Sequence, residues 1–252
     1  MLVVLAIAVP LGAAVLRDDE AAPSVAQDQR GPVILVPGYG GSTRSLIFLQ
    51  SYLTSRGRDV TVLDLPGDGT GDLRDAADHL ADVVDDLLDS SGAPSVDLVG
   101  YSAGGEIVRW YVAVLGGAFR TRRVVTLGSP HHGTDLAALA SGVAGGACPE
   151  ACQQLAPDSD LLRELNEDET PAGPLYTAIW TENDATVVPA DSGSLEGALT
   201  YAVQDVCPDL EVSHAALPQT GPTLQMVEAA LGTGKPQRPD ADICDRAIRF
   251  AG

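Results

Sequence analysis

Ser102 has the sequence surroundings of a catalytic nucleophile. It is the centre of Gly100-Tyr101-Ser102-Ala103-Gly104, a G-x-S-x-G motif that follows the apolar run 96–99 and precedes a helical segment. In such a strand–turn–helix arrangement the flanking glycines let strand and helix approach closely, so that a serine in a strained turn projects its hydroxyl above the sheet. The same letters also occur in ordinary glycine-rich turns. Their place between strand and helix is what favours a nucleophile here.

A serine hydroxyl is a weak nucleophile near neutral pH and needs a neighbouring base. His214 is the one histidine after position 132, and it lies between the last predicted strand and the last predicted helix. His79 is on the acidic outer face of a predicted helix. His131 and His132 follow a strand but precede every suitable acid, although the chain order of such sites is serine, acid, histidine. We expect His214 to be the base and His131 and His132 to support a loop near the site.

Asp184 is the expected acid because it follows the strand that ends at Trp180 and precedes an apolar turn. Its carboxylate would fix the tautomer of His214 and stabilise the imidazolium that forms when Ser102 loses its proton. The competing carboxylates, which we expect to be surface charges, are Glu182, Asp191, Asp205 and Asp209.

Developing negative charge on a substrate oxygen also needs N–H donors. One is expected from Ala103, directly after the serine, and one from the loop 37–41, where glycines let the backbone turn inward at Tyr39. A plain glycine-rich turn is the alternative for this loop. A loop that binds nucleotide phosphates is not expected here, because neither G-K-[ST] nor G-x-G-x-x-G is present. Ser129 is a poor rival nucleophile because Pro130 after it lacks the N–H that such a site uses.

The elements that must position these residues alternate between strand and helix. Apolar runs predict strands at 32–36, 60–65, 96–100, 123–127, 175–180 and 199–203, and helical spacing predicts helices at 72–90, 106–115, 159–166 and 223–231. This alternation predicts an α/β fold with a mostly parallel, doubly wound sheet and helices on both faces. Ligand sites of such sheets lie beyond the carboxyl ends of the strands, where the candidate residues occur.

A long insert, roughly residues 134–173, separates the fourth and fifth predicted strands. It carries more leucines than a connector needs, namely Leu136, Leu139, Leu155, Leu161, Leu162 and Leu165. We expect it to form a wall or lid of the substrate pocket; the simpler alternative is that these leucines pack the insert onto the core.

Composition limits the partners. Asp and Glu number 35 against 15 Lys and Arg, for a formal net charge of -20, which argues against electrostatic binding to nucleic acid or anionic membranes. Residues 1–30 read as a signal peptide or N-terminal anchor plus linker, because Met1 to Leu16 are apolar or small. A buried helix is the remaining alternative for that segment. Residues 31–252 are expected to form one catalytic domain, secreted or anchored through residues 1–16.

The 4 cysteines form an even set in a chain that has an export-like start. Two disulfides are therefore expected, and three pairings are possible. Cys148 and Cys152 can close a small loop, which leaves Cys207 to pair with Cys244. A zinc site is disfavoured by the C-x-x-x-C spacing without a nearby histidine, and no metal is expected.

Taken together, the motifs resemble the bacterial lipase class 2 family of α/β-hydrolases, particularly secreted actinobacterial members, over about residues 31–231. The segments that carry the likeness are 36–41, 100–105, 126–134, Asn183-Asp184 and Ser213-His214. The resemblance implies hydrolysis of lipid or other acyl esters without a cofactor, and it implies Tyr39 and Ala103 as oxyanion donors. No obligatory protein partner is evident. The insert with Cys148 and Cys152 departs from minimal members and leaves the acyl-chain preference open.

Three other activities fit the same motifs. An acyl-enzyme can be resolved by an alcohol, as in an acyltransferase, or supplied by a polymer, as in a polyester depolymerase. A non-catalytic binding protein on this fold is the third, although such proteins usually lack one member of the catalytic set.

Overall fold

The computed structural model describes residues 25–141 and 148–245. The expected export segment, Met1 to Leu16, lies outside the described residues. Within them, none of the helices has the length and apolar character that crossing a membrane requires.

A six-stranded sheet in the order β2-β1-β3-β4-β5-β6 forms the centre, and every neighbouring pair of strands is parallel. The strands are β1 (Val33–Val36), β2 (Val60–Val62), β3 (Val96–Tyr101), β4 (Thr121–Leu127), β5 (Leu175–Trp180) and β6 (Leu199–Ala202). The order reverses at β1, so the chain winds outward in both directions. The predicted doubly wound α/β class is confirmed.

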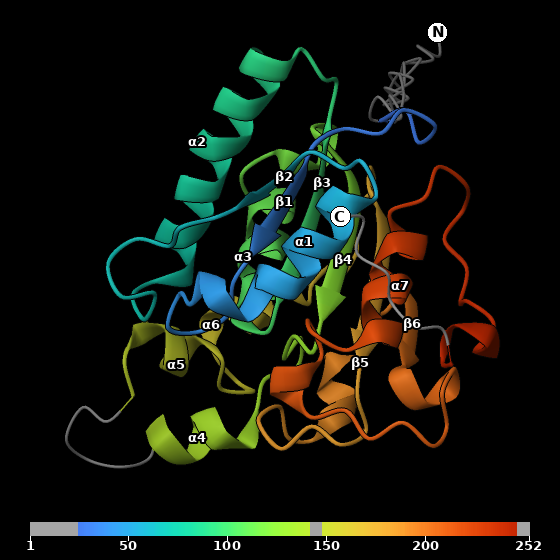
Figure 1. Cartoon of the computed structure of the whole chain (residues 1–252). Coiled ribbons are helices and arrows are strands. Elements are labelled where there is room, and N and C mark those ends of the chain that lie inside the picture. Colours follow the sequence, from blue (N-terminus) through green and yellow to red (C-terminus); the bar gives the residue numbers. More distant parts are fainter. Residues whose placement is uncertain (1–24, 142–147, 246–252) are drawn as a thin grey trace, which may run out of the picture.

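Helices cover both faces of this sheet. They are α1 (Ile47–Ser55), α2 (Leu73–Ser91), α3 (Ala103–Ala113), α4 (Asp135–Ser141), α5 (Glu150–Gln154), α6 (Asp160–Leu165) and α7 (Gly221–Ala230). Ile34 and Val36 point into a core shared with α2, α3 and the insert, whereas Val33 and Leu35 point into a core shared with α1 and α7. Figure 1 shows α2 and α7 on opposite sides of the strands.

The strand register brings the predicted site residues to one edge. Val36 lies opposite Gly100, and Gly100 lies opposite Thr126. Leu127 in turn lies opposite Ile179. The turns that follow β1, β3, β4 and β5 therefore emerge side by side, as parallel strands require.

Helix α3 begins three residues earlier than the sequence predicts, directly after Ser102. Gly104 and Gly105 argue against helix by intrinsic propensity. Tertiary packing overrides it, because a Cβ at Gly104 would lie 2.3 Å from the Val36 carbonyl oxygen of β1. Helix α1 was not predicted, because its nine residues carry only a weak separation of apolar and polar faces. Strand β2 ends at Val62 instead of Leu65.

The insert between β4 and β5 contains α4, α5 and α6. Leu155, Leu161, Leu162 and Leu165 are buried in the core shared with α2 and α3, as the simpler packing alternative expects. Leu136 at the start of α4 is 48% exposed. A lid role for the insert stays a prediction, and the buried leucines restrict it to the α4 part of the segment.

Two disulfides join Cys148 to Cys152 and Cys207 to Cys244, which is the pairing favoured by the spacing. The second one ties the C-terminal part of the described chain to the segment after β6.

Residues 25–31 dock at the opposite end of the sheet from the strand carboxyl ends. Arg122 donates to the Gln27 carbonyl at 3.0 Å and Arg58 to the Gly31 carbonyl at 3.2 Å. Both guanidiniums also pair with the buried Asp97. Figure 1 shows this segment, in blue, far from α4.

Candidate active site

Ser102 occupies a strained turn between β3 and α3. Its φ of 54° makes it the only residue other than glycine with a positive φ in the described ranges. Such a conformation costs of order 1–3 kcal/mol and persists only where surrounding structure imposes it. The Ser102 N–H donates to the Leu127 carbonyl at 2.9 Å, and the Ser102 carbonyl accepts from Gly105 at 2.9 Å. These contacts hold the turn between β4 and the first turn of α3.

The structure brings Ser102, His214 and Asp184 together in one line. His214 Nε2 lies 3.0 Å from Ser102 Oγ, and His214 Nδ1 lies 2.7 Å from Asp184 Oδ2. Asp184 and His214 are each 9% exposed, whereas Ser102 is half-buried. The serine is therefore within reach of solvent while the pair behind it is shielded. In this geometry Nδ1–H donates to the carboxylate and Nε2 is free to accept the serine proton.

The turn that carries Asp184, residues 181–188, orients its carboxylate. Asp184 Oδ1 accepts from the N–H groups of Thr186 and Val187, both at 2.8 Å. This arrangement leaves Oδ2 for His214. Oδ1 is thus fixed by two backbone N–H groups, which limits rotation of the side chain. We call residues 181–188 the acid turn.

Tyr101 packs behind His214 and was not singled out from the sequence, because the motif allows any residue there. Its ring centre lies 5.2 Å from that of His214, and its hydroxyl donates to the His214 carbonyl at 3.2 Å. Burial, together with the nearby charge of Asp184, raises the pKa of Tyr101 to about 12. The hydroxyl therefore stays protonated and continues to donate at neutral pH.

The loop after β1 lies directly beside the serine. A Cβ at Gly38 would be 2.8 Å from Ser102 Cβ and 3.1 Å from the Tyr101 carbonyl oxygen, so only glycine fits. Gly40 donates its N–H to the Gly69 carbonyl and Gly41 donates to the Gly38 carbonyl, both at 3.0 Å. These two N–H groups are engaged within the protein. Tyr39 lies between Gly38 and Gly40 in the sequence and is 45% exposed. Its N–H remains our expected oxyanion donor from this loop.

The rival residues have other surroundings. Ser129 is 1% exposed, and a Cβ on Gly105 of α3 would lie 2.1 Å from its hydroxyl. Asp205 accepts from the Ala202 N–H and so closes a turn after β6. Glu182, Asp191 and Asp209 are exposed.

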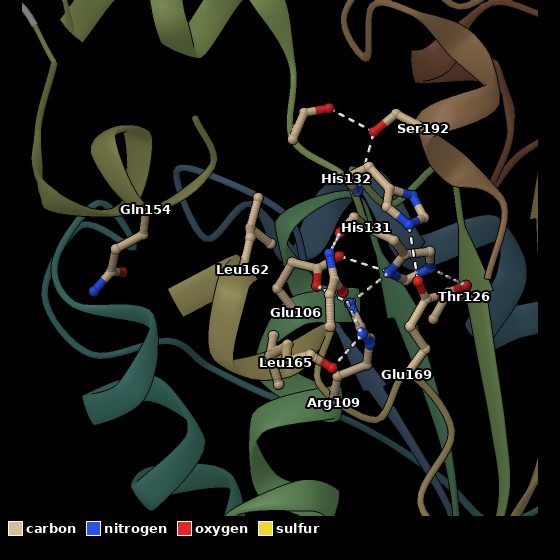
Figure 2. Close-up of polar contacts among 12 residues, drawn as sticks. Glu106, Arg109, Thr126, His131, His132, Gln154, Leu162, Leu165, Glu169 and Ser192 are labelled. Carbon is tan, nitrogen blue, oxygen red and sulfur yellow. Dashed lines mark hydrogen bonds and ion pairs between the residues drawn. The ribbon is translucent and has the colours of Figure 1, made fainter. Parts of the chain in front are cut away.

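His131 belongs to a buried polar cluster beside the site. Its Nε2 lies 2.9 Å from Thr126 Oγ1 and its Nδ1 lies 2.8 Å from Glu106 Oε1. Arg109 donates to Glu106 at 2.9 Å and to the Leu165 carbonyl of the insert at 2.9 Å. Figure 2 shows Glu106 and Arg109 of α3 converging on His131. The cluster therefore connects α3, β4 and the insert beneath the loop that follows β4.

Charges in this cluster are tightly coupled. Burial lowers the pKa of His131, so the ring is neutral at neutral pH. Burial alone would raise the pKa of Glu106, but the adjacent His131 and Arg109 outweigh it and lower that pKa. The cluster thus holds one carboxylate and one guanidinium with a neutral ring. His132, in contrast, is exposed and pairs with Glu169 at 2.9 Å. Both histidines support the loop after β4, as expected.

No group of three or more His, Cys, Asp and Glu side chains that could hold a metal ion occurs in residues 25–141 and 148–245.

Comparison with known proteins places the fold. The family described as alpha/beta hydrolase fold matches residues 31–142, a segment that contains Ser102 but ends before Asp184 and His214. A triacylglycerol lipase from Pseudarthrobacter phenanthrenivorans is 34% identical over 115 residues, which is 43% of this chain and 35% of that protein. A triacylglycerol lipase from Burkholderia plantarii is also 34% identical over 115 residues, 43% of this chain and 32% of that protein. The alignment thus spans about a third of the length of these relatives.

Solved structures extend the likeness in fold to most of the chain. Aspergillus fumigatus lipase B superposes with a TM-score of 0.74 at 20% identity, over 89% of this chain and 59% of that one. The mature form of a Bacillus licheniformis lipase superposes with a TM-score of 0.64 at 20% identity, over 81% of this chain and 92% of that one. The chain therefore has the fold of the α/β-hydrolases.

Proposed function

We propose that the protein is a serine hydrolase that cleaves carboxylic esters through an acyl-enzyme on Ser102. The observation that carries this proposal is the line from Ser102 Oγ to His214 Nε2 at 3.0 Å and from His214 Nδ1 to Asp184 Oδ2 at 2.7 Å. The three residues occur in the chain order serine, acid, histidine that this fold uses. The similarity to triacylglycerol lipases supports an ester as the substrate.

Acylation begins when Ser102 Oγ attacks the carbonyl carbon and its proton moves to His214 Nε2. Asp184 stabilises the imidazolium, and the N–H groups of Tyr39 and Ala103 donate to the carbonyl oxygen as it becomes negative. The imidazolium then gives its proton to the alcohol oxygen, the carbon–oxygen bond breaks, and the alcohol leaves. The acyl group remains on Ser102.

Deacylation repeats these steps with water. His214 removes a proton from a water molecule as its oxygen attacks the acyl carbon. The bond to Ser102 Oγ then breaks, the carboxylic acid leaves, and the proton returns to the serine. No further group has to enter the reaction.

The finer parts of the proposal concern substrate and location. We propose lipid or other water-insoluble acyl esters of short to medium chain as substrates, with the exposed start of α4 near the entrance. The two disulfides and the export-like first residues support secretion, because disulfides persist in oxidising compartments. The fold and its disulfides support one catalytic domain over residues 31–252.

The test combines a chain-length series of p-nitrophenyl esters with covalent trapping by a fluorophosphonate. We expect ester hydrolysis by the wild type, a phosphonate adduct on the peptide that contains Ser102, and neither in Ser102→Ala. An adduct on Ser129 would overturn the nucleophile assignment. Labelling of Ser102 without hydrolysis of any ester would overturn the ester specificity.

Product analysis in the presence of an added alcohol separates the related activities. Free carboxylic acid as the main product supports hydrolysis. A new ester of the added alcohol as the main product would make the protein an acyltransferase. Release of soluble fragments from a solid polyester, with no activity on small esters, would make it a depolymerase.

A further inference from the structure

The acid and the base reach the site on two separate segments that must be held in register. Asp184 lies in the acid turn after β5. His214 comes after β6, at the end of the segment formed by residues 206–213. We call residues 206–213 the base loop. Neither segment contains a helix or a strand, and side-chain hydrogen bonds join the two near the 2.7 Å contact between His214 and Asp184.

Gln204 lies at the point where these segments meet. Its Oε1 accepts from the Glu182 N–H of the acid turn at 3.0 Å. Its Nε2 donates to the Leu210 carbonyl of the base loop at 2.8 Å and to Asn183 Oδ1 at 3.0 Å. A backbone N–H can only donate and a backbone carbonyl can only accept, so these partners fix the orientation of the amide. One half-buried side chain thus bonds both segments at once.

Two neighbours of Asp184 complete the connection. Thr181, the fully buried first residue of the acid turn, donates through Oγ1 to the Val212 carbonyl at 2.7 Å. Asn183 Oδ1 accepts from the Val212 N–H at 3.4 Å. Val212 precedes His214 by two residues, so its backbone is held on both sides just before the base.

We propose that Gln204 is a positioning residue for the acid–base pair, with Thr181 as its partner in the same task. This inference rests on the proposed function, because it concerns the alignment of Asp184 with His214. Gln204 touches neither the substrate nor the reacting atoms. It sets the separation of the acid turn from the base loop, and thereby the direction in which His214 Nε2 faces Ser102.

Replacement of the amide by a carboxylate is the sharpest perturbation. Gln204→Glu keeps the acceptor toward Glu182 but places an oxygen where Nε2 donates to Leu210 and Asn183. Two acceptors would then face each other, and the base loop would move away from the acid turn. A misplacement on the order of 1 Å at a catalytic group can cost about 10²-fold in rate. The substrate-facing surface would be unchanged.

The experiment measures two rates on the intact chain, namely kcat and KM for a soluble p-nitrophenyl ester and the rate of fluorophosphonate labelling of Ser102. For Gln204→Glu we expect kcat and the labelling rate to fall by the same factor, about tenfold to a hundredfold, with KM unchanged. Thr181→Val should act in the same direction, which guards against a folding defect peculiar to one variant. Asp205→Ala is the matched control, because the Asp205 side chain closes the same turn through Ala202 and forms no side-chain hydrogen bond to the acid turn or the base loop. It should lower the melting temperature and leave kcat unchanged.

A double-mutant cycle with Asp184→Asn distinguishes positioning from general stability. Once the carboxylate is lost, Gln204→Glu should lower kcat little further, because both substitutions remove the same interaction. Full additivity, or labelling of Gln204→Glu at the wild-type rate, would overturn the positioning role. A wild type that labels at Ser102 but hydrolyses no ester would overturn the proposed function alone, because the labelling comparison needs no ester.

Discussion

Ser102 combines a positive φ with a side chain, and the surrounding glycines explain how this conformation is maintained. Gly38 brings the loop after β1 against the Ser102 side chain, and Gly104 lets α3 pack on the end of β1, both at distances that no larger residue allows. The strained backbone belongs to the residue that carries the nucleophile. The sharp turn at Ser102 directs its hydroxyl outward, away from the helix. The motif needs its glycines because their close packing maintains the unfavourable backbone conformation of Ser102.

Substitutions of Ser102, His214 and Asp184 should lower the hydrolytic activity to different extents. Ser102→Ala and His214→Ala should each lower kcat by about 10⁴-fold or more, because the residues act as a unit. Asp184→Ala should retain about tenfold to a hundredfold more activity than either, since the acid only orients and stabilises the base. Steady-state kinetics on one soluble ester measures all three.

His132→Ala provides the control for this series, because His132 is exposed and pairs with Glu169 away from Ser102. It should keep near wild-type kcat. A dead His132→Ala together with an active His214→Ala would show that the base has been misassigned.

The buried cluster predicts a loss of stability on acidification. The folded-state pKa of His131 is below its ordinary value of 6.5, so below that pH the unfolded chain binds a proton that the folded chain does not. The free energy of unfolding should therefore fall as pH drops below about 6.5, with a slope on the order of 1 kcal/mol per pH unit from this group. Glu106, with a lowered pKa, adds a further loss below its ordinary 4.5.

Urea unfolding between pH 5 and pH 8 tests this effect. His131→Asn, which keeps a donor toward Glu106, should flatten the curve below about pH 6.5. An unchanged slope in His131→Asn would mean that another group is responsible.

At the residue scale, the sequence predicted the positions with a fixed motif or a fixed chain order. Ser102 could be recognised from G-x-S-x-G, and Asp184 and His214 from their order and their place after predicted strands. Tyr101, Thr181 and Gln204 could not be recognised. They are ordinary residue types, and the contacts that reveal their role reach far along the chain. The separation is 113 residues from Tyr101 to His214, 31 from Thr181 to Val212 and 22 from Gln204 to Glu182.

Among the elements, the two disulfides should contribute unequally to stability. Cys207 and Cys244 are separated by 37 positions in the sequence, whereas Cys148 and Cys152 are separated by 4. Loop-closure entropy gives about 4 kcal/mol for the longer loop and about 2 kcal/mol for the shorter. Urea unfolding of Cys207→Ala/Cys244→Ala should therefore show the larger loss.

The variant Cys148→Ala/Cys152→Ala is its natural comparison, since it removes the same chemistry from a short loop. If both double variants lost equal stability, the entropic account of the longer disulfide would be wrong. Reduction of the wild type should reproduce the sum of the two losses.

The same scale shows where sequence patterns stop being informative. The apolar run of β3 predicts both ends of that strand to within one residue. Strand β4 begins two residues before its predicted start, because Thr121 and Arg122 are polar. The start of α3 was missed because its glycines serve packing, which only the neighbouring strand reveals. The leucines of the insert could not be divided into core and surface without knowing that α5 and α6 pack on α2 and α3.

For the molecule as a whole, the formal charge of -20 predicts sensitivity to the charge of an insoluble substrate. Hydrolysis of a neutral ester emulsion should slow when anionic lipid is added, because the protein and the surface repel each other. Salt at 0.15 M or above should reduce the difference, since the Debye length is then about 8 Å or less. The rate on a soluble ester should not depend on the anionic lipid. Faster hydrolysis on anionic emulsions would contradict this prediction.

The docking of residues 25–31 by Arg58 and Arg122 has a practical meaning for anyone who wishes to immobilise this protein. Parallel strands begin at that end and finish at the end where Ser102 lies, so the two sites are at opposite poles. A resin or a display scaffold coupled ahead of residue 25 would be attached on the far side from the serine. The end of the sheet that carries Ser102 would then face the bulk liquid, and oil droplets could approach it without obstruction by the support.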